Sequence, residues 1–90
     1  MAKVKIPQPL RKLSEGKDEV TVEGESVEKV LESLEEKYPQ IRERIRDEGG
    51  KLRRFINIFV NGNDIRHLQA EETPVKEDDE VSILPAIAGG

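Results

Sequence analysis

Apolar and polar residues alternate in two segments near the start of the chain, which is the pattern of strands that bury one face. In AKVKIP, Val4 and Ile6 share one face and lysines take the other, and in EVTVEG the apolar face carries Val20 and Val22. Prolines end the first segment, and a turn region around Gly16 separates it from the second. The sequence therefore predicts two half-buried strands joined by a turn.

Helical spacing replaces alternation after Ser26, which is a favourable N-cap residue. Pro39 disfavours helical geometry at the residue before it and closes this helix. The segment QIRERIRDEGG predicts a further short helical turn, stopped by Gly49 and Gly50. The main helix presents one apolar stripe, made of Val27, Val30, Leu31, Leu34 and Tyr38.

The segment RFINIFVNGNDIR carries a hairpin pattern. Six strand-like residues run into Asn61-Gly62, a pair that accepts the positive φ angles of a tight turn. The second arm, residues 64–66, is short, and a polar connection leads to a last strand over EVSILP. The sequence predicts an α+β domain, because one main helix packed on one face of a small mixed sheet buries both apolar surfaces.

Composition narrows the class of protein. Ninety residues are expected to form one domain, and apolar residues in periodic segments are typical of a folded chain. The net charge of −4 disfavours nucleic-acid binding, which neutralises phosphates with basic residues. No apolar run approaches the ~20 residues of a membrane span and no signal-peptide pattern opens the chain, so we expect a cytoplasmic protein without a membrane partner. The absence of cysteine excludes disulfides, a thiolate nucleophile and a cysteine metal site.

Other polar features are weaker candidates for function. His67 is the only histidine and has no other ligand type clustered around it, so we interpret it as a surface residue and expect no metal site. The basic stretch of residues 42–54 is interrupted by acidic residues, which favours a surface or an electrostatic contact with an enzyme over an RNA site. The main helix also has an acidic face, which is either solvated or attracts a basic partner. This face comprises Glu28, Glu32, Glu35 and Glu36.

The segments KLRRFINIFVNGNDIR and TPVKEDDEVSILPAIAGG together resemble the ubiquitin-like sulfur carriers of the ThiS and MoaD families. Among these the chain is most similar to the CysO type, the carriers of thiocarboxylate-dependent cysteine biosynthesis. The likeness extends from VKIPQPLRKL to the last residue, and its recurrent features are Val60-Asn61, the acidic turn at residues 78–81 and the terminal LPAIAGG. The resemblance implies a single ubiquitin-like β-grasp domain over residues 1–90, with the first and last strands parallel and adjacent at the centre.

The resemblance also implies a role for the C-terminal diglycine. A terminal carboxylate can enter the active site of another enzyme, and glycine lets the backbone approach closely because it has no Cβ. In the family's cycle ATP adenylates the carboxylate, here that of Gly90, and a sulfur nucleophile displaces AMP to leave a thiocarboxylate. We expect the tail, residues 86–90, to be flexible in the free protein. The tail residues expected to thread into the partner's active site are Ala86, Ile87, Ala88 and Gly89.

The resemblance implies a protein cosubstrate and not an enzyme. No cofactor is expected to be bound, because ATP is used by the activating enzyme. The implied partners are a ubiquitin-activating-like adenylating sulfurtransferase and a sulfur-accepting biosynthetic enzyme such as a cysteine synthase, and the free protein is expected to be a monomer. Carriers for molybdopterin or thiazole synthesis are alternatives, and so is a ubiquitin-like modifier joined to lysines of target proteins. A further alternative is that the two glycines are only a frayed or appended end.

In a β-grasp sheet the last strand pairs with the third, so the alternation of strand residues predicts a docking surface. Asn57 is polar and is expected to face away from the helix, which assigns Phe55 and Phe59 to the same outer face. Leu84 in the last strand is expected on this face too, near Phe59. Large apolar side chains beside a reactive tail favour a patch that a partner covers. The alternative is a minor second core beneath a loop.

Overall fold

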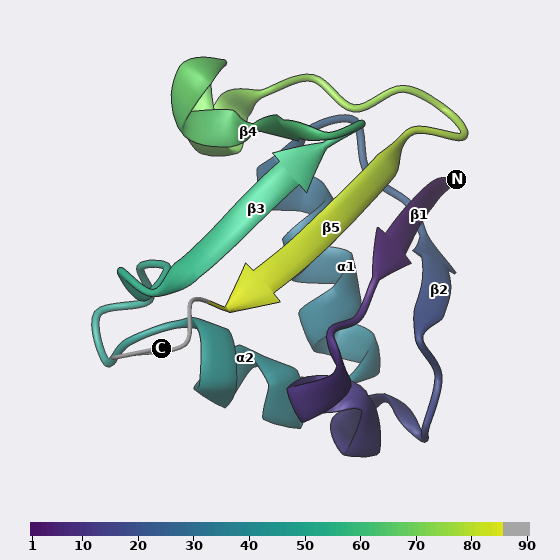
Figure 1. The fold of residues 1–90 in the computed structure, drawn as a ribbon, viewed down its shortest axis with the longest axis vertical. Coiled ribbons are helices and arrows are strands. Elements are labelled where there is room, and N and C mark those ends of the chain that lie inside the picture. Colours follow the sequence, from purple (N-terminus) through teal and green to yellow (C-terminus); the bar gives the residue numbers. More distant parts are fainter. Residues whose placement is uncertain (86–90) are drawn as a thin grey trace.

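The computed structural model describes residues 1–85, which form a five-stranded mixed sheet with helices packed against one face (Figure 1). The strands stand in the order β2-β1-β5-β3-β4. Their bounds are β1 Ala2–Lys5, β2 Glu19–Val22, β3 Ile56–Val60, β4 Asn63–Asp64 and β5 Glu80–Pro85. The α-helices are α1 Val27–Lys37 and α2 Pro39–Ile45, and short 3-10 helices cover Gln8–Ser14, Ile65–His67 and Ala70–Glu72.

β5 lies at the centre of the sheet, between the first strand and the third (Figure 1). It runs parallel to β1, with Val81 opposite Val4, and antiparallel to β3, with Ile83 opposite Ile58. The flanking positions are taken by β2, which is antiparallel to β1, and by the two-residue β4, which is antiparallel to the end of β3. The β-grasp arrangement implied by the resemblance is therefore confirmed.

The predicted alternation separates a buried face from an outer face along the four longer strands. Burial alternates along β1, β2, β3 and β5, and every strand residue predicted to face the helix is at most 7% exposed. α1 and Tyr38, the residue after its last turn, cover this face with the whole predicted stripe, of which Tyr38 is the most exposed member at 6%. Each large aliphatic side chain buried in this way contributes roughly 1.5–3 kcal/mol. We call the opposite side of the sheet the outer face.

α1 begins and ends where the sequence predicts. The Oγ of Ser26 accepts a hydrogen bond from the backbone N–H of Lys29 at 3.3 Å, which satisfies one of the free donors of the first turn. Pro39 follows the last residue of the helix, and the N–H of Tyr38 donates to the carbonyl of Leu34 at 2.8 Å. Within residues 1–85 neither this helix nor any other is long and apolar enough to cross a membrane.

The connections are more helical than the sequence predicts. The turn region after β1 contains the 3-10 helix Gln8–Ser14, because prolines that end a strand are well suited to the first turn of a helix. The segment after Pro39 is the α-helix α2, and it ends at Ile45 rather than at the glycines. Gly49 and Gly50 instead form a turn around Asp47, whose carboxylate accepts a hydrogen bond from the N–H of Gly49 at 2.9 Å.

The second arm of the hairpin also differs from the prediction. β4 covers Asn63–Asp64, not residues 64–66, and the chain then turns into the 3-10 helix Ile65–His67. This turn forms because the Asp64 carboxylate accepts a hydrogen bond from the backbone N–H of Arg66 at 2.8 Å, as an N-cap does. A local side-chain hydrogen bond therefore ends the strand.

Two residues interpreted as surface charges are buried. Arg46 and Glu35 are 7% and 9% exposed, and the Nε of Arg46 donates to a Glu35 carboxylate oxygen at 2.5 Å. The same guanidinium donates to the carbonyl of Gly50 at 2.8 Å and lies 3.4 Å from Glu28. The interpretation was wrong because burial of these charges is compensated by this ion pair, which sequence spacing does not reveal. The pair joins α1 to the loop before β3.

Replacing Arg46 with alanine should lower the free energy of unfolding by about 3 kcal/mol, because it leaves the Glu35 carboxylate buried without a partner. Urea unfolding followed by far-UV circular dichroism measures this loss. Lys29→Ala is the matched control, since its ion pair with Glu32 is exposed and should contribute less than about 0.5 kcal/mol. Equal losses in the two variants would contradict the structural role of the buried pair.

Candidate functional site

The C-terminal end of β5 brings the start of the tail to one end of the central strands. Pro85 lies opposite Ile56, the first residue of β3, and β1 finishes at the same end because it is parallel to β5. The predicted reactive terminus, the predicted threading residues and their expected flexibility lie outside the described residues. They are Ala86, Ile87, Ala88, Gly89 and Gly90. The described structure thus fixes the base of the tail at the centre of the sheet.

Large apolar side chains lie on the outer face of β3 and β5 and in the turn just before β3. Phe55 and Leu84 are 46% and 47% exposed, and Phe59 is partly buried. Leu84 stands opposite Asn57 and Phe59 stands opposite Ser82, so Leu84 and Phe59 are diagonal neighbours. The predicted facing of these two residues is confirmed, and Phe55 lies just before β3. We call Phe55, Phe59 and Leu84 the outer-face patch; its role in docking stays a prediction.

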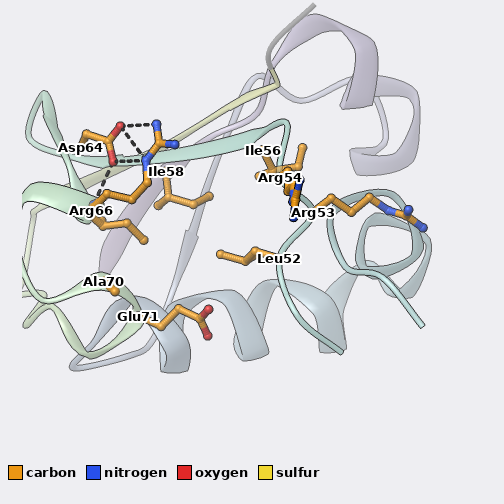
Figure 2. Close-up of a pocket in the computed structure, with 10 residues that line it drawn as sticks. Leu52, Arg53, Arg54, Ile56, Ile58, Asp64, Arg66, Ala70 and Glu71 are labelled. Atoms are coloured by element: carbon orange, nitrogen blue, oxygen red, sulfur yellow. Dashed lines mark hydrogen bonds and ion pairs between the residues drawn. The ribbon is translucent and has the colours of Figure 1, made fainter. Parts of the chain in front are cut away.

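An arginine that the sequence interpretation missed lies beside this patch. The Nη2 of Arg66 donates to an Asp64 carboxylate oxygen at 2.7 Å (Figure 2) and to the side-chain oxygen of Asn57 at 2.7 Å. The side-chain hydrogen bonds from Arg66 lower the pKa of Asp64 to about 2, so this carboxylate stays charged at neutral pH. The sequence DIR could have indicated the first contact. The second requires the folded hairpin, because Asn57 lies on the other strand.

A hollow of about 450 Å³ opens along the edge of β3 (Figure 2). In Figure 2 the Asp64–Arg66 pair lies on one side of Ile58, and Arg53 and Arg54 lie on the other. The rest of the lining is aliphatic apart from Glu71. None of the residues that line this hollow is a serine, cysteine or histidine, so the lining offers charge and apolar surface but no nucleophile paired with a base.

Two carboxyl groups approach each other on the helix side of the sheet. A hydrogen bond with Glu28, together with partial burial, raises the pKa of Glu71 to about 6. The predicted acidic face therefore divides, since Glu28 and Glu35 bind Arg46 while Glu32 and Glu36 are exposed.

The remaining candidates do not gather into a site. His67 is exposed in the turn after β4, and residues 1–85 hold no group of histidine, aspartate and glutamate side chains that could bind a metal ion. The basic stretch also divides. Arg42 and Arg44 are exposed on α2, whereas Arg53 and Arg54 lie just before β3, near the base of the tail.

Two of the recurrent sequence features, Val60-Asn61 and the acidic turn at residues 78–81, contact each other in the structure. The side chain of Asn61 donates to Asp79 at 3.1 Å and accepts from the backbone N–H of Glu80 at 3.0 Å. The backbone N–H of Asn61 also donates to the carbonyl of Glu80 at 2.8 Å. Asn61 and Gly62 have φ angles of 51° and 87°, as the predicted tight turn requires. Asn61 therefore joins the hairpin to the start of β5 and helps to set its register.

The sequence was compared with protein families and with known proteins. The ThiS family model matches residues 4–90. The chain belongs to the ThiS family. It is 42% identical over 89 residues to the sulfur carrier protein CysO of Mycobacterium tuberculosis, a match that covers 97% of this chain and 96% of that protein. The resemblance to CysO-type sulfur carriers inferred from the motifs is confirmed.

Solved structures of related proteins share this fold. A chain in the crystal structure of the Amycolatopsis orientalis BexX/CysO complex is 38% identical, with a TM-score of 0.91 over 100% of both chains. The solution structure of small archaeal modifier protein 1 from Methanosarcina acetivorans is 42% identical, with a TM-score of 0.89 over 99% of this chain and 95% of that one. This ThiS-family chain is therefore similar to proteins named as carriers and to a protein named as a modifier.

Replacing Glu71 with glutamine should stabilise the fold at pH 7 and leave its stability unchanged at pH 4. The raised pKa means that the folded state holds this proton more tightly than the unfolded state, so stability falls as the pH rises from 4.5 to about 6. Glutamine cannot ionise, and it removes the repulsion from Glu28. We expect a gain of about 0.5 kcal/mol at pH 7, measured by urea unfolding at both pH values. Glu72→Gln, an exposed neighbour, is the control for the change of net charge, and the same gain in both variants would contradict the assignment.

Proposed function

We propose that this ThiS-family chain carries sulfur as a thiocarboxylate on Gly90 and donates it in biosynthesis, with cysteine as the favoured product. The observation that carries the proposal is the match of the ThiS family to residues 4–90, which include the terminal diglycine, together with the 42% identity to CysO over 97% of this chain. The described structure supports it, because the central strand of the sheet leads directly into the tail. Sulfur carriers are substrates and not catalysts, and a carrier needs no catalytic group of its own.

The Gly90 carboxylate is unreactive until it is activated. In the proposed cycle one of its oxygens attacks the α-phosphate of ATP, so that an acyl-adenylate forms and pyrophosphate leaves. A hydrosulfide-class nucleophile then attacks the acyl carbon, the C–O bond to AMP breaks, and a C–S bond takes its place. The chain contains no cysteine that could compete for the activated acyl group. In this proposal ATP is bound by the activating enzyme, and the carrier binds no cofactor itself. Because the cycle consumes ATP, we propose that it runs in the cytoplasm.

The proposed partners are an adenylating sulfurtransferase related to ubiquitin-activating enzymes and a sulfur-accepting enzyme such as a cysteine synthase. Each partner receives the tail and so meets the surface around its base at Pro85. The outer-face patch lies on this surface and offers exposed apolar area for docking. The Amycolatopsis structure, a complex of CysO with BexX, supports the binding of such a carrier to another protein. We propose that the free chain is a monomer.

Deletion of Gly90, or addition of one residue after it, should abolish loading with sulfur. The fold should survive, because the core described above is built from residues 2–83. Loading by the host's adenylating enzyme is measured as a gain of about 16 Da in intact mass, the difference between oxygen and sulfur. Circular dichroism checks the fold. A truncated chain that still gains this mass would overturn the proposed chemistry.

Phe59→Ala should weaken binding to the adenylating enzyme by at least ~1 kcal/mol, as loss of an interface anchor does. Because Phe59 is only partly buried, we expect a smaller loss in the free energy of unfolding. Calorimetric titration and urea unfolding measure the two effects separately. Leu68→Ala, which alters an exposed apolar residue outside the patch, is the control. Unchanged affinity in the Phe59 variant would show that docking uses another surface.

A ubiquitin-like modifier is the second candidate function. The observation that favours it is the comparison with solved structures, in which the chain is 42% identical to small archaeal modifier protein 1 of Methanosarcina acetivorans and 38% identical to the CysO of Mycobacterium tuberculosis. Both functions begin with the same acyl-adenylate, but a modifier ends in an amide bond to a lysine of another protein. Intact mass of the chain isolated from its host separates the two, because conjugates are larger by a whole target protein.

A further inference from the structure

Arg66 is held in one position at the open edge of β3. β4 pairs only with Phe59 and Val60, so the strand neighbour of β3 ends before Asn57 is reached. The Arg66 side chain extends along β3 beyond the end of β4, as far as Asn57. Its Nη2 donates at 2.7 Å to both Asn57 and Asp64, and its Nε lies 3.2 and 3.3 Å from the two Asp64 oxygens. The guanidinium is therefore fixed by one residue of its own turn and one of the sheet.

This fixed guanidinium still has donors to offer. Arginine has five N–H donors, and within residues 1–85 the Nη1 of Arg66 makes no hydrogen bond. The side chain is 66% exposed, so these donors are open to a second molecule. A ligand that binds here does not have to immobilise a mobile arginine, which is a large part of the cost of binding a long side chain.

The guanidinium borders the outer-face patch. Its partner Asn57 lies opposite Leu84, and its other partner Asp64 lies opposite Phe59. Arg66 therefore has apolar residues of the patch in the two neighbouring rows of the sheet. An arginine next to aromatic and aliphatic anchors is a typical composition for the centre of a protein interface.

The charges near the patch favour an anionic group on the partner. Asp64 balances Arg66, and Arg53 and Arg54 add positive charge just before β3. One arginine of this protein already binds two carboxylates, since Arg46 contacts both Glu35 and Glu28. A guanidinium paired with Asp64 can therefore accept a second carboxylate, and planar forked recognition suits that group.

We propose that Arg66 is the polar anchor of the outer-face patch and receives a carboxylate of the adenylating enzyme while the apolar patch is covered by the same enzyme. This inference rests on the proposed function, because it names the chemistry of the partner at the docking surface. The matching surface on the enzyme therefore carries an aspartate or glutamate beside an apolar area.

The test uses the full chain and the adenylating enzyme of its host. This enzyme is identified during purification by ATP–pyrophosphate exchange that depends on the carrier. Arg66→Ala should raise the KM for the carrier about tenfold and leave kcat unchanged, because Arg66 acts in docking and not in the reaction. Arg66→Lys keeps the charge but loses the fork, so it should raise KM to a smaller extent. Arg42→Ala, which removes an exposed arginine beside the acidic face of α1, should leave KM unchanged.

The dependence of KM on ionic strength is a second readout, and it would not change if Arg66 had a purely structural role. The KM of the wild-type chain should rise with ionic strength, and the KM of Arg66→Ala should rise less steeply, because one screened contact is missing. An unchanged KM in Arg66→Ala, or equal salt dependence in the two proteins, would overturn the inference and leave the proposed function intact. If Arg66→Ala does not fold, a wild-type KM independent of salt would overturn it. Absence of any exchange with the wild-type chain would overturn the proposed function itself.

Discussion

β5 forms backbone ladders on both sides, with β1 and with β3, and its inward residues Val81 and Ile83 are 0% and 1% exposed. Displacing this strand would break two ladders and open the core, so it is held more firmly than any edge strand. It is also the last strand within residues 1–85. The tail therefore starts from the most constrained part of the sheet, and in the proposed function a partner that receives the tail meets a fixed surface around Pro85.

The two faces of this sheet have separate tasks because strand side chains alternate. The residues that face α1 build the core, while those on the outer face, including Phe59 and Leu84, are free to serve another molecule. Substitutions on the outer face can alter docking without emptying the core. This separation suits the proposed function, in which the chain has to keep its fold while it passes between enzymes.

Arg46 and Arg66 show how burial decides the role of the same side chain. Arg46 is 7% exposed and uses two carboxylates and a backbone carbonyl of its own chain, so it serves stability. Arg66 is 66% exposed at its side chain and retains free donors on Nη1 within the described residues. Its intramolecular hydrogen bonds orient the guanidinium and leave donors available for a second molecule, which favours recognition.

The sequence by itself determined the features that depend on neighbours along the chain. Alternation assigned the strand faces, the stripe from Val27 to Tyr38 assigned the helix, and Asn61-Gly62 assigned the hairpin turn. The motifs also indicated the family, which the family model confirms. Local spacing is sufficient for these features because each follows from backbone geometry over a few residues.

Only the tertiary structure decided which charges are buried and which residues meet across the sheet. Sequence spacing could not show that Arg46 would reach Glu35, since Glu35 lies in α1 and Arg46 follows the end of α2, so the ion pair exists only when these segments pack together. In the same way the register of β3, β4 and β5 places Arg66 against Asn57 and sets Leu84 diagonal to Phe59. These contacts depend on where separate segments dock, and the free energy that fixes their position comes from the shared core and not from any one segment.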